Sequence, residues 1–352
     1  MKMRPRLVYC TTVMASFARK DVQLLSTAFD VKVHLFAPRR KWLTPLSLLQ
    51  QFAFLIRHLG GSSVSVTQFG GYHSLLPVLL GALFRVPSVI VLGGYDCASF
   101  PSFSYGARRR APLSWFTRWS LRKARHLVPC SLSLMHSQQH YLQISSDPKE
   151  QGCLAFDPAL RTAFTVIPYG YDADRFRPKG PRIPNSFLTV AQMNAPNFRR
   201  KGIDLFFGLA RRWPEYQFTL VGNTPGMKYA EIPGNVELIG FIPYEELPEV
   251  YARHAFYLQL SIWEGFPSAP CEAMLCGCVP IVSAVAALPE IAGDTGFILA
   301  HRDENELMRL VEKALSMDIE PLSAAARARI QSKYPMSTRD AFLNLVKQIG
   351  AD

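Results

Sequence analysis

The sequence has no C-x-x-C pair, no low-complexity tract and no long uninterrupted apolar run. Zinc knuckles and disulfide frameworks depend on paired cysteine spacings, so we expect the seven cysteines to be reduced and mostly buried. A membrane-spanning helix needs about 20 nearly continuous apolar residues, and the best candidate, residues 74–93, is interrupted by Pro77, Arg85 and Pro87. The short N-terminal apolar run also lacks a small-residue cleavage site. These absences predict a cytoplasmic protein.

The composition is that of a folded protein. Of the 352 residues, 49% are hydrophobic and 19% are charged, which is too apolar a balance for a disordered chain. At roughly 150 residues per domain, the length predicts about two domains.

Acidic residues are scarce in the first half of the chain. Residues 1–168 hold 20 Lys and Arg against 6 Asp and Glu, which gives a formal charge of +14, whereas residues 169–352 hold 19 against 21, which gives −2. A one-sided basic field attracts the phosphates of nucleic acid, anionic lipid or a phosphorylated substrate. Because no RNA-binding motif, zinc finger or basic region joined to heptads occurs, nucleic acid is not an expected partner.

Two basic segments rich in aromatic residues concentrate that charge. The first begins at Arg39 and leads through Trp42 into an apolar helical pattern, and the second begins at residues 108–110 and continues past Trp115 and Trp119. Cations beside aromatic residues on amphipathic segments are typical of helices at a membrane interface. The alternative is a core helix with a solvated basic face. We expect an anionic membrane surface as a partner, on the inner face of the cytoplasmic membrane.

Short apolar runs alternate with amphipathic stretches in both halves of the chain. This rhythm predicts parallel sheets covered by helices, with ligands collecting at the carboxyl ends of the strands. Gly170, Gly180 and four prolines interrupt the rhythm between residues 164 and 184, which is a linker composition. The expected organisation is α/β: a first domain over 1–168, a linker over 169–186, a second domain over 187–336 and a separate final helix within 337–352.

Two carboxylates mark the second half, within the stretch SIWEGFPSAPCEAMLCGCVPIVS. Glu264 follows a predicted strand, and Glu272 is expected in the first turn of a helix that Pro270 opens, which would turn both carboxylates toward one crevice. The helix N-terminus and nearby amides suit sugar hydroxyls and a phosphate, and those amides belong to Gly265, Phe266 and Ser268. The alternative is that Glu272 only balances the helix dipole and that Glu264 is solvated.

These residues resemble the signature of GT-B glycosyltransferases, specifically the retaining group called family 4. The resemblance extends through Ala273-Met274, Gly277, Pro280 and Leu288-Pro289-Glu290, and upstream through residues 166–176 and Lys201-Gly202-Ile203-Asp204. It implies two Rossmann-like domains facing a cleft, the second binding the donor, with the final helix returning to the first. It also implies that no metal and no further cofactor are needed, the nucleotide-sugar being a substrate.

The resemblance assigns roles to matching residues. Glu264 would bind hydroxyls of the transferred sugar, Glu272 the ribose of the nucleotide, and Lys201 the donor diphosphate. Fixed cations and amides can neutralise a departing nucleoside diphosphate without a metal. The family also places an arginine shortly before the lysine, where this chain has Val190-Ala191-Gln192. We expect Arg199 or Arg200 to substitute, although an arginine beside a helix start is often solvated.

The first half matches the family less closely. The loop after the first strand, which ends at Ser16, lacks the usual glycines. Asp96 follows a strand in a Gly-Gly-Tyr-Asp run, so it is a candidate to orient or deprotonate the acceptor hydroxyl, the alternative being a turn cap. His73, after the similar run Gly-Gly-Tyr-His, and Ser16 are weaker candidates on the acceptor side.

The expected function is therefore a retaining glycosyltransferase, a hexosyltransferase in particular. It would transfer a sugar to a hydroxyl of a glycan or lipid-linked acceptor in bacterial cell-envelope polysaccharide biosynthesis. Two alternatives stay open. One is another GT-B enzyme, a phosphorylase or a nucleotide-sugar epimerase, and the other is a non-catalytic basic adaptor at the membrane. Fold analogy gives the class of reaction but not the sugar or the acceptor.

Overall fold

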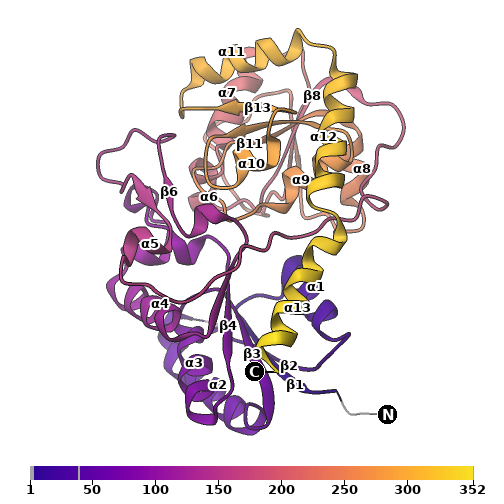
Figure 1. The fold of residues 1–352 in the computed structure, drawn as a ribbon. Helices are drawn as coiled ribbons and strands as arrows, with labels where there is room; N and C mark the ends of the chain where they lie inside the picture. The colour runs from indigo at the N-terminus through magenta and orange to yellow at the C-terminus, as the bar shows by residue number, and fades with distance from the viewer. Residues whose placement is uncertain (1–3, 39, 352) are drawn as a thin grey trace.

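The computed structural model describes residues 4–38 and 40–351. Arg39, in the first basic segment, lies outside the described residues. Two parallel sheets lie one above the other, each covered by helices, and the chain passes between them twice (Figure 1). The α/β fold expected from the sequence, with two Rossmann-like units, is confirmed.

The first sheet has the strand order β2-β1-β3-β4-β5, with every pairing parallel. Its strands are β1 (Arg6–Thr11), β2 (Asp30–Leu35), β3 (Ser62–Gln68), β4 (Ser88–Leu92) and β5 (His126–Pro129). The connecting helices are α1 (Ser16–Leu25), α2 (Thr44–His58), α3 (Tyr72–Phe84) and α4 (Ala111–Lys123). A two-residue strand pair and a short helix follow, namely β6 (Ser137–Gln138), β7 (Glu150–Gln151) and α5 (Cys153–Phe156).

The second sheet has the order β10-β9-β8-β11-β12-β13, also parallel. Its strands are β8 (Ile183–Val190), β9 (Phe218–Val221), β10 (Val236–Ile239), β11 (His254–Gln259), β12 (Val279–Ser283) and β13 (Phe297–Leu299). Its helices are α6 (Ala195–Arg200), α7 (Ile203–Arg212), α8 (Leu247–Ala252), α9 (Ser268–Leu275), α10 (Leu288–Ala292), α11 (Glu304–Leu315) and α12 (Ile319–Lys333). The final helix is α13 (Asp340–Ile349), preceded by a single 3₁₀ turn over Met336–Arg339.

Three elements differ from the sequence expectation. Strand β8 begins at Ile183, inside the predicted linker, because the main chain there pairs with β11 from His254 onward. Helix α9 begins at Ser268, two residues before Pro270, with Pro267 as its N-cap. Helix α12 was not predicted, because its buried positions are small residues, Ser323 and Ala326, alongside a single larger one, Ile330.

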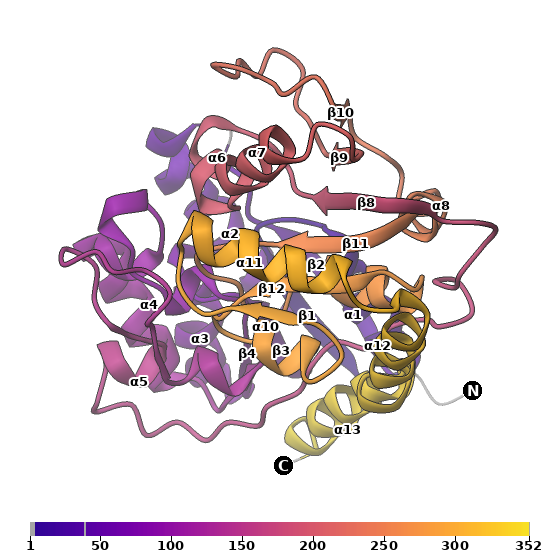
Figure 2. The ribbon, with the colours of Figure 1, turned by 90° about the horizontal axis from the view of Figure 1, so that it is seen from above.

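The chain returns from the second sheet to the first through α12 and α13, which follow one another along one side of the molecule (Figure 2). A buried ion pair anchors this return. The Arg339 guanidinium donates to both carboxylate oxygens of Asp21 on α1, each at 2.8 Å, and to the carbonyl oxygen of Ile167 at 2.9 Å. It also lies over the rings of Tyr169 and Phe342, 4.5 and 4.2 Å from their centroids.

No helix in the described part of the chain is long and apolar enough to cross a membrane. All seven cysteines are unpaired and buried, as expected.

We expect Arg339→Ala to lower the free energy of unfolding by about 3–5 kcal/mol, because it leaves the buried carboxylate of Asp21 without its charged partner. Chemical denaturation measures this loss. The matched control is Arg211→Ala, which removes an exposed ion pair with Glu231 and is expected to cost at most about 1 kcal/mol. Equal effects of the two substitutions would contradict an anchoring role for Arg339.

Candidate active site

A cavity of about 480 Å³ lies where the carboxyl ends of both sheets meet, a size within the range of small-molecule sites. The first unit contributes residues that follow β1, β3, β4 and β5, including the start of α1, namely Ala15, Ser16, Phe17, Phe69, Gly93 and Cys130. The first chain crossing adds Tyr169. The second sheet contributes Val190, Gln192, Lys201, Gln259 and the run from Glu264 to Ala269. Both halves of the chain therefore line one site.

Glu264 is the most strongly held side chain of this cavity. Its Oε1 accepts hydrogen bonds from Lys201 Nζ at 2.5 Å, Ser261 Oγ at 2.7 Å and Gln259 Nε2 at 3.1 Å. Burial alone would raise the pKa of Glu264, but Lys201 and Arg200, together with the hydrogen bonds, hold it below its ordinary value. The carboxylate is therefore ionised and fixed in place.

Lys201 reaches Glu264 because of the glycine that follows it. Lys201 is the C-cap residue that follows helix α6, and Gly202 has φ +73° before α7 begins. A Cβ atom at Gly202 would lie 2.3 Å from the carbonyl oxygen of Leu260. Only glycine permits this close approach of the lysine-bearing turn to the loop that carries Glu264.

Gly265, Phe266 and Ser268 line the cavity as expected. Gly265 also packs against the first unit, since a Cβ there would lie 2.0 Å from the carbonyl oxygen of Gly93. Trp263 Nε1 donates to the carbonyl oxygen of Gly94 at 3.2 Å across the same contact. The two units thus touch directly beside the site.

Glu272 corrects the expectation of two carboxylates in one crevice. Because α9 begins at Ser268, Glu272 is its fifth residue rather than a first-turn residue, and it does not line the cavity. It is 3% exposed and accepts from Tyr251 Oη at 3.3 Å. Burial raises the pKa of Glu272, and the nearby Lys20 only partly opposes that effect. Lys20 comes from α1 of the first unit and lies over the rings of Tyr171 and Tyr244.

Neither candidate replacement for the family arginine reaches the cavity. Arg200 donates to Asn197 Oδ1 through Nε at 3.0 Å and through Nη2 at 2.8 Å, and it lies 4.6 Å from the centroid of the Tyr105 ring. Arg199 is exposed, with Asp204 at 3.9 Å. The position that the family fills with arginine is Gln192, which does line the cavity.

On the acceptor side, Ser16 lines the cavity, whereas Asp96 and His73 do not. The Asp96 carboxylate is 1% exposed and accepts from the backbone amides of Gly70 at 3.0 Å, Gly93 at 3.2 Å and Gly94 at 2.9 Å. In this geometry Asp96 caps a turn and joins two strand ends, and its catalytic role stays a prediction.

His73 lies outside the cavity, and its acceptor-side role stays a prediction. The side chain is 4% exposed, and its Nε2 lies 2.8 Å from the carbonyl oxygen of Gln68. Burial lowers the pKa of His73, so its ring is neutral and serves packing.

Sequence reasoning missed three polar residues of the site. Ser261 and Gln259 hold Glu264, and Tyr169 borders the cavity, where its hydroxyl accepts from Gln68 Nε2 at 3.0 Å. The spacing of Ser261, three residues before Glu264, was a local signal. Gln259 and Tyr169 carried none. Within residues 4–38 and 40–351, no group of three or more His, Cys, Asp or Glu side chains is arranged to hold a metal ion.

The family model described as glycosyl transferases group 1 matches residues 178–331, which include Lys201 and Glu264. Residues 178–331 belong to this family. The fold of the whole chain is that of GT-B glycosyltransferases. Sucrose-phosphate synthase from Thermosynechococcus elongatus superimposes with a TM-score of 0.76 at 17% identity, over 98% of this chain and 99% of that one. An Anabaena protein in complex with UDP and glucose superimposes with a TM-score of 0.65 at 14% identity, over 97% of this chain and 100% of that one.

Curated relatives match this chain over shorter stretches. A phosphatidylinositol N-acetylglucosaminyltransferase subunit of Arabidopsis thaliana is 27% identical over 163 residues, which are 43% of this chain and 36% of that protein. O-antigen chain mannosyltransferase B of Escherichia coli is 33% identical over 100 residues, 28% of this chain and 26% of that protein. The matches thus span about a third or less of the length of these relatives.

Glu272 makes stability depend on pH. Its pKa is higher in the folded state than in the unfolded chain, so its contribution is fully present below the unfolded value and is lost as pH rises through the folded value. We expect Glu272→Gln, which does not titrate, to flatten the fall in unfolding free energy above the ordinary glutamate range. Chemical denaturation at a series of pH values measures the unfolding free energy of this variant. The control is Glu215→Gln, which alters an exposed glutamate. A Glu272→Gln curve parallel to that of the unsubstituted protein would contradict this assignment.

Proposed function

We propose that this chain is a glycosyltransferase that moves a sugar from a nucleotide-sugar donor to an acceptor hydroxyl, with retention at the anomeric carbon. The observation that carries the proposal is the Lys201–Glu264 pair, at the cavity between two Rossmann-like units and inside a glycosyl transferases group 1 domain. No specific contact of this site favours a phosphorylase, an epimerase or a non-catalytic adaptor.

Without a ligand, the lysine ammonium neutralises the glutamate. A donor diphosphate would offer Lys201 a second anion, and its sugar hydroxyls would offer Glu264 new donors in place of the lysine. The N-terminal amides of α9, from Ser268 onward, face the same space and favour negative charge. Lysine and amides would together stabilise the departing diphosphate, so the proposal includes no metal ion and no further cofactor.

The ribose role of Glu272 is a more demanding part of the proposal. Its carboxylate lies behind the cavity, near Tyr251 and the ammonium of Lys20. A ribose that hydrogen-bonds Glu272 would therefore have to displace the Lys20 side chain, which comes from the other unit of the molecule. Donor binding and the contact between the two units would then be coupled.

The acceptor proposal draws on the relatives and on charge. One relative is named for phosphatidylinositol and another for the O-antigen chain. Together with the excess of +14 in residues 1–168, these names favour a glycan or lipid-linked acceptor in bacterial cell-envelope polysaccharide biosynthesis, met at the inner face of the cytoplasmic membrane. Because Asp96 is occupied by backbone amides, we propose that a donor diphosphate oxygen accepts the acceptor proton.

A panel of UDP, GDP, ADP and CMP with their sugars tests the proposal through thermal shifts, because a ligand that binds the native state raises its apparent stability. We expect one nucleotide to stabilise the protein. Lys201→Ala should weaken the binding of that nucleotide by roughly 10- to 150-fold. This factor is the equivalent of about 1.5–3 kcal/mol for a lost charged hydrogen bond. Glu264→Ala should keep nucleoside diphosphate binding but lose turnover.

The matched control is Lys313→Ala, an exposed lysine on α11 outside the cavity. It should bind the nucleotide as the unsubstituted protein does. If no nucleotide shifts the melting temperature, or if Lys201→Ala and Lys313→Ala bind equally, the donor site is wrongly placed.

A further inference from the structure

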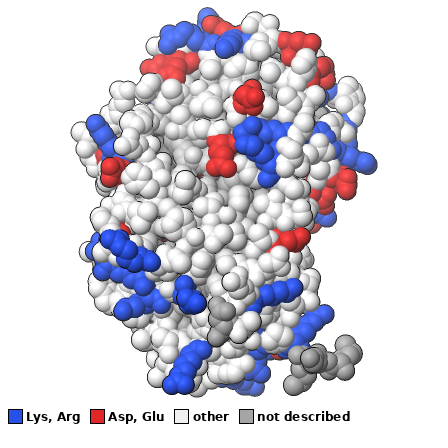
Figure 3. Space-filling view, viewed as in Figure 1, with Lys and Arg blue, Asp and Glu red and all other residues white. Residues whose placement is uncertain are grey.

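The surface of the first unit is almost free of carboxylates. Between Asp30 and Asp147, the only acidic residue is Asp96, against 13 Lys and Arg. Asp96 is buried and its carboxylate is occupied by three backbone amides, so it contributes no exposed negative charge. In the space-filling view, the lower part of the molecule shows broad uncharged areas, Lys and Arg, and little acidic surface (Figure 3).

Helix α2 in this stretch is apolar on its outer side as well as its inner side. Its inner side buries Gln51 and Leu55. The 3₁₀ turn before the helix and its outer side expose large apolar residues at intervals of three and four, namely Trp42 at 70%, Leu46 at 51%, Leu49 at 66%, Phe52 at 44% and Ile56 at 47%. A helix that is apolar on both sides normally lies buried on both. Among the described residues, nothing covers the outer side of α2.

The neighbouring helices extend the same surface. Helix α3 packs against both α2 and α4. It exposes Leu79 at 47% and Leu83 at 71%, and α4 exposes Trp115 at 57%. Contiguous exposed apolar surface of this kind marks an interaction site on a soluble protein. We call the outer side of α2, α3 and α4, with Trp42, the helical face.

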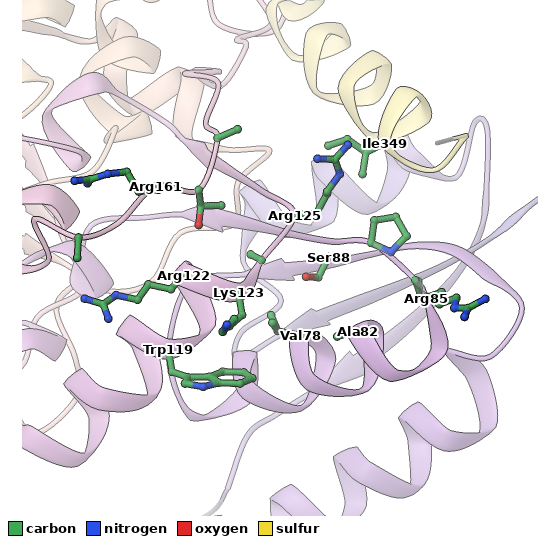
Figure 4. A pocket seen from close by; sticks show the side chains of 17 residues that line it. Val78, Ala82, Arg85, Ser88, Trp119, Arg122, Lys123, Arg125, Arg161 and Ile349 are labelled. Carbon is green, nitrogen blue, oxygen red and sulfur yellow. The ribbon is translucent and has the colours of Figure 1, made fainter.

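A basic hollow of about 1000 Å³ adjoins the helical face, where α3 and α4 end (Figure 4). Five cations line it, and no carboxylate does, among the described residues: Arg85, Arg122, Lys123, Arg125 and Arg161. Asp157 pairs with Arg122 from outside the hollow. Arg85 and Lys123 line the hollow and are exposed. A concave surface lined by one sign of charge concentrates the opposite charge, here phosphate groups.

We propose that the helical face docks on a bilayer surface that contains anionic phospholipid. The apolar side chains of α2 and α3 would enter the boundary between headgroups and acyl chains, and the basic hollow would receive headgroup phosphates. Charge complementarity selects this occupant over a protein with an ordinary mixed surface, because the described residues of the face and of the hollow offer apolar contact and cations but no carboxylate. The inference rests on the proposed action at a membrane, to which it adds the residues that make the contact.

Flotation with phosphatidylcholine vesicles, with or without phosphatidylglycerol, tests the docking. We expect the protein to float with the mixed vesicles and to lose most of that binding at high salt, where exposed charges are screened. Leu49→Ser with Leu83→Ser should reduce flotation at least tenfold, because the apolar contact is lost. Arg85→Gln with Lys123→Gln should remove the preference for phosphatidylglycerol.

Two control variants carry matched changes on the second unit. Phe241→Ser alters a side chain that is 88% exposed, and Arg211→Gln alters an exposed cation. Both should float as the unsubstituted protein does. All four variants change exposed side chains, and circular dichroism with thermal unfolding verifies that each is folded.

Three results would overturn the docking. One is no flotation at low salt, and another is equal loss in the helical-face and control variants. The third is a dimer in solution that Leu49→Ser with Leu83→Ser dissociates, which would assign the face to a second copy. Nucleotide thermal shifts on the same variants keep the two proposals separate: retained shifts without flotation reject the docking alone, and flotation without any shift rejects the donor site alone.

Discussion

The buried pair between Arg339 and Asp21 is the constraint on which the relation between the two sheets depends. The chain leaves the first sheet near Tyr169 and returns at Arg339, and the guanidinium touches both crossings, since it donates to Ile167 and lies over the ring of Tyr169. Separating the two partners would leave an uncompensated buried charge, which is strongly destabilising. The direct contacts beside the cavity therefore form between two units that the Arg339–Asp21 pair also holds together.

The cavity is built on a second charge pair with a different character. Lys201 and Glu264 are 18% and 13% exposed, so both remain within reach of solvent and of a ligand. The hydroxyl of Ser261 and the amide of Gln259 orient the carboxylate, and Gly202 allows the lysine turn to approach. A partly exposed ion pair that a ligand can rearrange suits a binding site, whereas the buried pair between Arg339 and Asp21 suits a fixed attachment between the two units.

Much of the fold followed from periodicity in the sequence. Strands such as β9 and β12 alternate with helices such as α7 and α11, as the apolar rhythm of the sequence predicts, because each buries a regular face. Helix α12 escaped prediction since alanines and serines fill much of its buried side. Strand β8 begins early because its first residues gain a partner in β11, which lies some 70 positions along the chain.

The site was less predictable, and the reasons are particular. Glu264 and Lys201 could be singled out by a local motif, but their pairing depends on the turn at Gly202 meeting Leu260. The turn-capping contacts of Asp96 include the amide of Gly70, 26 residues earlier, which no local pattern reveals. The position of Glu272 depended on where α9 starts, and a shift of two residues moved the carboxylate from the cavity to the space behind it.

The contact between Gly265 and residues 93–94 sets a spacing that side chains cannot adjust. A single methyl group on Gly265 would overlap the carbonyl oxygen of Gly93, and one on Gly94 would crowd the amide of Gly265 at 2.9 Å. Either methyl would push the two units apart beside the cavity, while the chain crossings still hold them together. The two units would then tilt apart about the chain crossings, and the cavity would widen by an amount that the size of the added group controls.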